Sequence, residues 1–162
     1  MDHNFTELTV LDQESRVQPD DHLSLRLWLR LLTCTNLIQT QIRQQLRTEF
    51  DSTLPRFDLL AQLAREPSGL LMNALSKRLM VTGGNLTALA NQLESEGLIA
   101  RNAVQGDRRA SRITLTAQGK KDFAAMAAQH EKWISNLFSA LSRDEQRALH
   151  KLLHTLKKAP QS

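Results

Sequence analysis

Apolar residues recur every three or four positions over most of the chain, which is the spacing of one face of an α-helix. The longest such stretch covers residues 22–47 and contains no proline or glycine. Leucine also occupies every second position from Leu23 to Leu31, so the first turns are apolar nearly all round. A helix of this kind is buried on more than one side. Because the chain is small, we expect a second subunit to cover one of those sides.

Three shorter helices are predicted in the middle of the chain. A capping side chain in residues 51–53 precedes Pro55 and predicts a helix start, and breakers at residues 66–69 end that helix. Residues 71–79 carry leucine at every fourth position, which predicts a helix of about two turns. Thr82 is placed to cap a further helix over residues 82–96. Two short helices joined by a tight turn form a helix-turn-helix.

Residues 99–104 and 112–116 are predicted to form two short strands, with a turn at Gly106 between them. Thr116 is then placed to cap a long helix whose apolar stripe reaches Leu141. Ser142 and Glu145 have the spacing of a capping box, which predicts the start of a last helix.

The predicted fold class is therefore mainly α with a small β-wing. A winged helix-turn-helix is flanked by an N-terminal and a C-terminal helical segment.

A helix-turn-helix followed by a hairpin suggests binding to DNA, with the helix over residues 82–96 in the major groove. The paired glycines at its start lack Cβ atoms, so the backbone there can approach DNA closely, and the free N–H groups suit a phosphate. Asn85 and Thr87, which follow the glycines, point away from the apolar face and suit base edges. Two further polar residues lie within reach of the DNA backbone. The candidate contacts on this helix are Thr82, Gly83, Gly84, Asn85, Thr87, Asn91 and Gln92.

Arg108 and Arg109 follow the turn of the hairpin and are the candidate contacts of the wing. Arginine suits phosphates and also the narrow minor groove, where the negative potential is strong. Either feature has a simpler interpretation when taken alone. The arginine pair could be a solvated turn. The pair Gly83 and Gly84 could be a flexible turn or part of a nucleotide loop, although no G-x-G-x-x-G pattern is present.

The distribution of charge supports a polyanionic partner. The 162 residues carry a net charge of +4, but six acids and one arginine give residues 1–21 a net charge of −5. The rest of the chain therefore carries a net positive charge, which suits a polyanionic partner such as nucleic acid but does not identify one. No apolar run of about 18 residues predicts a membrane span, and no secretory signal is apparent, so we expect a cytoplasmic protein. The single cysteine excludes an internal disulfide.

The stretch LSKRLMVTGGNLTALANQLESEGLIARNAVQGDRRASRITLTAQGK closely resembles the DNA-binding core of the MarR family of bacterial regulators. The matching features are the leucine pair in L-x-x-x-L, the helix ending in L-E-x-x-G-L-I, then Arg101, the D-R-R triplet and L-T-x-x-G. The resemblance covers nearly the whole chain after the first 20 residues. It implies a homodimer that binds a palindromic operator, usually as a repressor, and it adds Arg101 to the candidate DNA contacts.

The resemblance also implies a division of the chain. Residues 1–21 would be an acidic extension, residues 22–50 and 117–158 a helical dimerisation region, and residues 51–116 the DNA-binding domain. Members of this family often release DNA when a small phenolic or anionic ligand binds between the dimerisation helices and the DNA-binding lobe. The subgroup regulating breakdown of aromatic acids suggests an aromatic carboxylate or its CoA thioester. The candidate ligand contacts are Arg26, Trp28, Arg30, Arg56, Phe57 and Trp133.

Those aromatic residues could equally be core or dimer packing, and the arginines could pair with acids. Cys34 is predicted to be a buried structural thiol rather than a redox sensor, because it lies within an apolar helix. His150 and His154 have a metal-binding spacing, but no third ligand is evident, so no metal and no cofactor is predicted.

No catalytic motif is apparent, and we expect no enzyme. The alternative function is a ligand-independent DNA-binding protein that acts architecturally or through a protein partner.

Overall fold

The structure is a computed structural model that describes residues 22–158, except for the side chains of Arg108 and Arg109. The predicted acidic extension, residues 1–21, lies outside the described residues. The chain divides into two compact units, Met1–Leu54 and Pro55–Ser162.

The described part of the first unit contains one long helix, α2 (Leu23–Phe50). Asp51, which the sequence placed at the start of the next helix, instead ends α2 in the left-handed conformation, with a φ of 46°. Ile42 and Leu46 are buried, whereas the side chain of Leu23 is 77% exposed and that of Trp28 57% exposed. The single chain therefore leaves the first turns of α2 exposed, and their predicted burial depends on the second subunit that is expected from the sequence.

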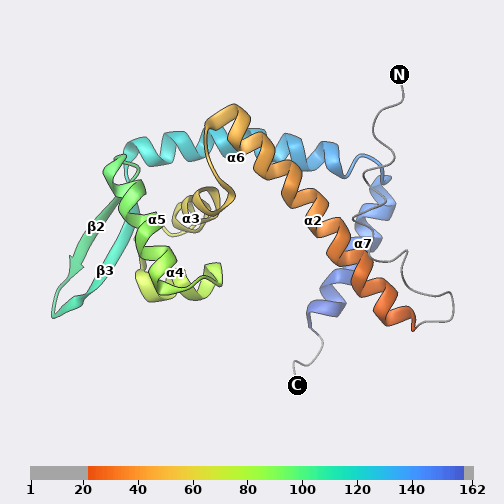
Figure 1. The fold of residues 1–162 in the computed structure, drawn as a ribbon, viewed down its shortest axis with the longest axis horizontal. Coiled ribbons are helices and arrows are strands. Elements are labelled where there is room, and N and C mark those ends of the chain that lie inside the picture. The colour runs from red at the N-terminus through yellow and green to blue at the C-terminus, as the bar shows by residue number, and fades with distance from the viewer. Residues whose placement is uncertain (1–21, 159–162) are drawn as a thin grey trace. The chain divides into compact units, whose positions relative to one another are not determined.

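The second unit holds the remaining elements, which are shown in Figure 1. Their order is α3 (Leu54–Ala64), β1 (Leu70–Leu71), α4 (Met72–Leu79), α5 (Gly83–Ser95), β2 (Ile99–Val104), β3 (Asp107–Leu115), α6 (Ala117–Leu137) and α7 (Arg143–Lys157). The three strands form an antiparallel sheet in the order β1-β3-β2. This mostly helical chain with a small sheet confirms the predicted fold class. In this unit α4 and α5 form the helix-turn-helix, and β2 with β3 forms the wing.

The largest fully buried side chains of the second unit are leucines and isoleucines that the helices and strands direct inward. Leu59 and Leu60 come from α3, Leu75 from α4, Leu93 from α5 and Ile113 from β3, and each is at most 1% exposed. These contacts hold the helix-turn-helix and the wing in a single core. The positions of polar side chains on α5 are therefore set by a well-packed base.

Two strands differ from the sequence prediction. The strand β3 begins at Asp107 rather than at residue 112, because backbone pairing with β2 continues almost to the turn at Gly106. A register irregularity between Ala103 and Val104 accompanies this extension. The two-residue strand β1 was not predicted at all. It exists because Leu70 pairs with Ile113 of β3, a contact that no local pattern reveals.

The L-T-x-x-G motif has a structural explanation at the start of α6. The Thr116 hydroxyl donates a hydrogen bond to the carbonyl of Gly97 at 2.6 Å and accepts one from the Gly119 N–H at 3.0 Å. A Cβ at residue 119 would lie 1.9 Å from the carbonyl oxygen of Leu98. The motif therefore holds the first turn of α6 against the segment that follows α5, and only glycine fits at residue 119.

The last two helices also confirm their predicted starts. Thr116 caps α6, and the capping box at α7 is complete, with Ser142 N–H donating to Glu145 Oε2 at 2.7 Å. The helix α6 ends at Leu137, however, rather than at Leu141.

Candidate nucleic-acid interface

The first turn of α5 is open to solvent. Thr82 caps the helix, with its hydroxyl accepting a hydrogen bond from the Asn85 N–H at 3.4 Å. Gly83 and Gly84 are exposed, and a Cβ built at either residue would meet no other atom within 4 Å. Asn85 is exposed as well. No side chain therefore projects from this end of the helix at the two glycines, and backbone N–H groups of the first turn are free. Both features suit close approach to a phosphate or a base.

The polar residues further along α5 have different surroundings. Thr87, Asn91 and Gln92 are all exposed, as the sequence predicted. The Thr87 hydroxyl already donates to the carbonyl of Gly83 at 2.8 Å, so it offers DNA an acceptor and a methyl group. The Asn91 side-chain oxygen accepts a hydrogen bond from Arg101.

Arg101 joins the wing to α5 from within the chain. Besides its hydrogen bond to Asn91, its Nε lies 3.2 Å from Oε2 of Glu94, and the arginine is about one-quarter exposed. The structure therefore brings two predicted DNA contacts, Arg101 and Asn91, together as partners of one another. Glu94, the glutamate of the L-E-x-x-G-L-I motif, was not a predicted DNA contact, and it completes this link between β2 and α5.

A second ion pair lies at the C-terminal end of α5. Arg56 of α3 donates from both guanidinium NH2 groups to the Glu96 carboxylate, with one distance of 2.8 Å. This hydrogen-bonded pairing lowers the pKa of Glu96, against a smaller opposing effect of burial. The two residues are 40 positions apart, and nothing in the local sequence indicated the pair.

The wing carries the arginine pair close to its turn. The backbone of Arg108 and Arg109 belongs to β3, which begins at Asp107 directly after Gly106. The side chains of the two arginines lie outside the described part of the structure. Arg112 of the same strand instead donates to the carbonyl of Gly69 at 3.0 Å. This bond ties the strand to the loop that precedes β1, a role the sequence analysis did not predict.

The predicted ligand contacts fall in both units. Arg26, Trp28 and Arg30 lie on α2 in the first unit. In the second unit, Phe57 and Trp133 are buried, at 7% and 6% exposure.

Phe57 and Trp133 belong to an aromatic cluster. The ring of Phe57 lies 5.5 Å from that of Phe123 and 4.7 Å from that of His130, and His130 lies 6.4 Å from the Trp133 ring. Burial lowers the pKa of His130, and the charge of Asp58 opposes that shift. Phe57 and Trp133 therefore contribute to the packing of this unit.

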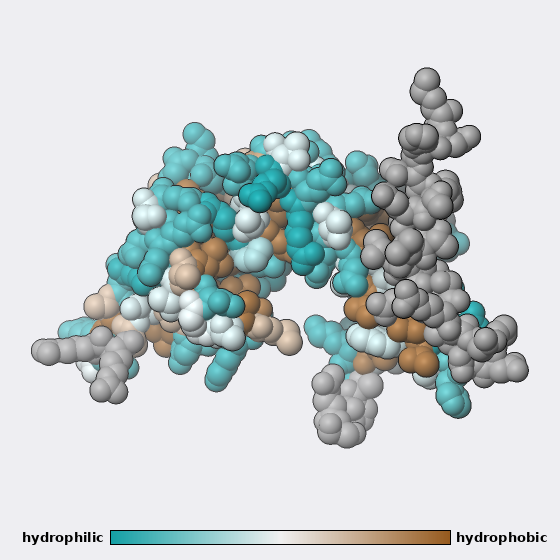
Figure 2. Space-filling model, viewed as in Figure 1, coloured by the Kyte–Doolittle hydropathy of each residue, from teal (hydrophilic) through white to brown (hydrophobic). Residues whose placement is uncertain are grey.

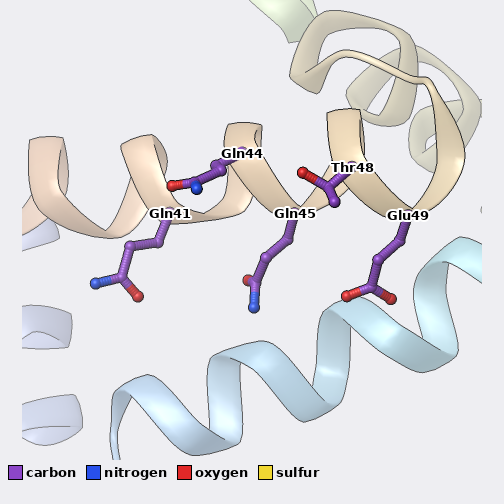
Figure 3. A pocket seen from close by; sticks show the side chains of 5 residues that line it. All are labelled: Gln41, Gln44, Gln45, Thr48 and Glu49. Carbon is purple, nitrogen blue, oxygen red and sulfur yellow. The ribbon is translucent and has the colours of Figure 1, made fainter.

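A polar pocket of about 380 Å³ lies along α2. Figure 3 shows Gln41, Gln45 and Glu49 extending in the same direction at four-residue spacing, with Gln44 and Thr48 also at the pocket. None of these five residues is a predicted ligand contact, and none is cationic. The carboxylate of Glu49 would repel a carboxylate ligand, and no cation in the pocket offsets it.

Cys34 is exposed, so the prediction of a buried thiol is wrong for the single chain. His150 and His154 are exposed on α7. Over residues 22–158, no three histidine, cysteine or acidic side chains are arranged to hold a metal ion. No helix in the same range combines the length and apolarity needed to cross a membrane.

The helix-turn-helix, the open first turn of α5 and the adjoining hairpin define a winged-helix protein. A model of the MarR family matches residues 50–110. An uncharacterized HTH-type transcriptional regulator of Bacillus cereus is 30% identical over 135 residues, which cover 83% of this chain and 88% of the relative. The chain belongs to the MarR family of DNA-binding transcriptional regulators.

Other relatives and solved structures are consistent with this family and its fold. The transcriptional regulator PecS of Dickeya dadantii is 24% identical over 92% of this chain and 91% of its own. MepR of S. aureus, solved in complex with DNA, has a TM-score of 0.70 and 25% identity, covering 87% of this chain and 100% of its own. AbsC of Streptomyces coelicolor shares the fold, with a TM-score of 0.74 at 21% identity over 88% of this chain and 97% of its own. These relatives are regulators rather than enzymes, as expected for this chain.

Proposed function

We propose that the chain is a homodimeric repressor that binds a palindromic operator and is released by a small aromatic carboxylate or its CoA thioester. The observation that supports the dimer is that α2 and α7 each expose several large apolar side chains. Hydrophobic side chains lie open at the surface of the described chain (Figure 2). The exposed leucines and tryptophan are Leu23, Leu25, Leu27 and Trp28 of α2 and Leu152, Leu153 and Leu156 of α7.

The helix α7 has an apolar face that nothing in the described part of the single chain buries. Its leucines at positions 149, 152, 153 and 156 follow one helical face, yet none of its residues is buried. Burial of one leucine side chain is worth about 2 kcal/mol. A monomer would leave this stabilisation unused, whereas a second copy would supply a matching apolar face.

The open first turn of α5 supports insertion into the major groove, and the backbone position of the arginine pair supports wing contacts to the phosphates or the minor groove. The proposed DNA contacts are Thr82, Gly83, Gly84, Asn85, Thr87, Gln92, Arg108 and Arg109, with Asn91 and Arg101 acting together. In a dimer, the two recognition helices would enter successive major grooves about 34–36 Å apart. Palindromic half-sites separated by one turn of DNA follow from this spacing.

The effector is proposed to act on the ion pair between Arg56 and Glu96. An incoming carboxylate would compete with Glu96 for the guanidinium of Arg56. Glu96 is the C-terminal cap of α5, so its release would loosen the anchored end of the recognition helix. Arg26, Trp28 and Arg30, with Phe57 and Trp133, are the further proposed ligand contacts. The fold accommodates a ligand in PcaV of Streptomyces coelicolor, which was solved with its natural ligand.

One relative favours activation rather than repression. BadR of Rhodopseudomonas palustris, 29% identical over 65% of this chain and 61% of its own, is a transcriptional activatory protein. A reporter gene placed behind the bound operator separates repression from activation by the sign of the change.

The dimer is tested by light scattering on the purified chain, with Leu152→Glu as the disruptive variant and Lys151→Glu as its matched control on the polar face. We expect the parent and the control to be dimers and Leu152→Glu to be a monomer that loses operator binding. A parent chain that is monomeric and binds no duplex would overturn the proposal. The effector is tested by thermal shift and DNA release with benzoate, a hydroxycinnamate and its CoA thioester, and failure of all three would overturn the effector class.

A further inference from the structure

Met80 stands out in the turn between α4 and α5. Its backbone has the left-handed conformation, with a φ of 54°, and its side chain is 92% exposed. Among the residues that the structure describes, Asp51 is the other non-glycine residue at positive φ. A short polar side chain such as aspartate tolerates this region because it hydrogen-bonds locally, but methionine gains no such contact.

The surrounding hydrogen bonds hold Met80 in this conformation. The Met80 N–H donates to the carbonyl of Lys77 at 3.4 Å, and the Val81 N–H donates to the carbonyl of Ser76 at 3.3 Å. The Ser76 hydroxyl donates to the carbonyl of Val81 at 2.7 Å, which closes the turn from the side. These are the hydrogen bonds of a left-handed helix C-cap, a position that glycine usually occupies, so the turn holds Met80 in a conformation that methionine rarely adopts.

The position of Met80 relates it to the proposed DNA contacts. It precedes the helix cap Thr82 by two residues, so the two Cα atoms lie at most about 7 Å apart. The major groove is about 12 Å wide, so a side chain this near the helix end would lie at the groove when α5 occupies it. Lys77, on the last turn of α4, is also exposed and places a positive charge beside the same turn.

We propose that Met80 contacts the C5-methyl group of thymine and is a specificity-determining residue, an inference that rests on the proposed binding of α5 in the major groove. The thymine methyl is the apolar group that base pairs present in this groove. An apolar, flexible thioether side chain suits a methyl group and gains little from a phosphate. Val81, 36% exposed, extends the same apolar surface.

The test uses a duplex that the parent chain selects from a random library, together with copies in which deoxyuridine replaces individual thymidines. Deoxyuridine removes only the methyl group. We expect the parent to bind the thymidine duplex about fourfold more tightly for each methyl contacted. We expect Met80→Gly to lose this preference at the same positions, and Met80→Leu, which keeps apolar bulk, to retain it.

The melting temperature shows whether a change in binding comes from a lost DNA contact or from a damaged fold. Glycine suits the left-handed backbone, so Met80→Gly is expected to melt at the parent's temperature or above it. Unchanged thymidine preference in Met80→Gly would overturn the inference. Equal weakening toward both duplexes would also overturn it, because the side chain would then contact sugar or phosphate. A parent chain that selects a duplex but ignores deoxyuridine refutes the inference alone, whereas one that selects no duplex refutes the proposed function.

Discussion

The backbone carbonyl of Leu98 occupies the space that a side chain at Gly119 would need, with only 1.9 Å between the carbonyl oxygen and a Cβ at that position. The first turn of α6 therefore packs directly on the segment that follows the recognition helix. Thr116 reinforces this packing through its hydrogen bond to Gly97. The wing and α6 are thus held against the end of α5 by backbone contacts.

The first prediction concerns this close approach. Gly119→Ala should lower the free energy of unfolding by about 3 kcal/mol or more, because backbone must move to admit the methyl group. Denaturant unfolding followed by circular dichroism measures the change. A loss below about 1 kcal/mol would show that the carbonyl of Leu98 does not pack here as described.

Gly84→Ala should have the opposite effect on stability, because a Cβ there meets no atom within 4 Å. Alanine favours a helix over glycine by up to about 1 kcal/mol, so the melting temperature should be unchanged or a few degrees higher. Affinity for DNA should fall, since the added methyl group stands where the backbone is proposed to approach the duplex. Fluorescence anisotropy with a labelled operator measures the affinity, and undiminished binding would place the glycine pair away from DNA.

Replacing Asn85 should change which sequences are bound. Asn85→Ala is expected to cost about 1–3 kcal/mol at the operator and much less on random duplex, because the amide is proposed to read base edges. Competition binding with both duplexes provides the comparison. Gln118→Ala, an exposed amide on α6, is the matched control. Equal losses on operator and random DNA would assign Asn85 to the phosphate backbone.

The arginines of the wing should govern the response to salt. Arg109→Ala is expected to weaken binding to all sequences and to flatten the dependence of affinity on salt concentration, because fewer counterions are released. Titrations at low and moderate salt give the slope. If the affinity of the variant depends on salt concentration as steeply as that of the parent, Arg109 does not contact DNA.

The Arg56–Glu96 pair predicts a dependence of stability on pH. The folded-state pKa of Glu96 is lowered, so the pair stabilises the fold above the unfolded-state pKa of the carboxyl group, and this stabilisation is lost as the pH falls through the lower folded-state value. Because the Glu96 side chain is 39% exposed, the effect is about 1 kcal/mol or less. Glu96→Gln should reduce the loss of stability as the pH falls below the ordinary pKa of a glutamate. Glu131→Gln on the exposed face of α6 is the control, and identical pH profiles for both variants would contradict the pairing.

Local patterns predicted the helical elements well because their signals lie within a few residues. Thr82, Thr116 and the Ser142–Glu145 box each cap the helix that the sequence assigned to them. The strand β1 could not be predicted in this way, since its two residues are ordered by pairing with β3 more than 40 positions later.

In the candidate site too, local features could be predicted from the sequence, whereas contacts between elements could not. Exposure of the polar residues on α5 followed from the helical period, because that period places them opposite the buried leucines. The partners of Arg56 and Arg101 did not follow, since each lies on another element. Burial of the first turns of α2 and of Cys34 was expected from the apolar pattern of this helix, but the single chain leaves these residues exposed.

The recognition helix is restrained unequally along its length. Its C-terminal half is linked to α3 through Glu96 and to β2 through Asn91 and Glu94, whereas its first turn touches no other element at the two glycines. Substitutions at Gly83 and Gly84 are therefore expected to leave the folding of the domain almost unaffected. The sequence preference of the recognition helix can thus change at these positions while the framework of the domain stays the same.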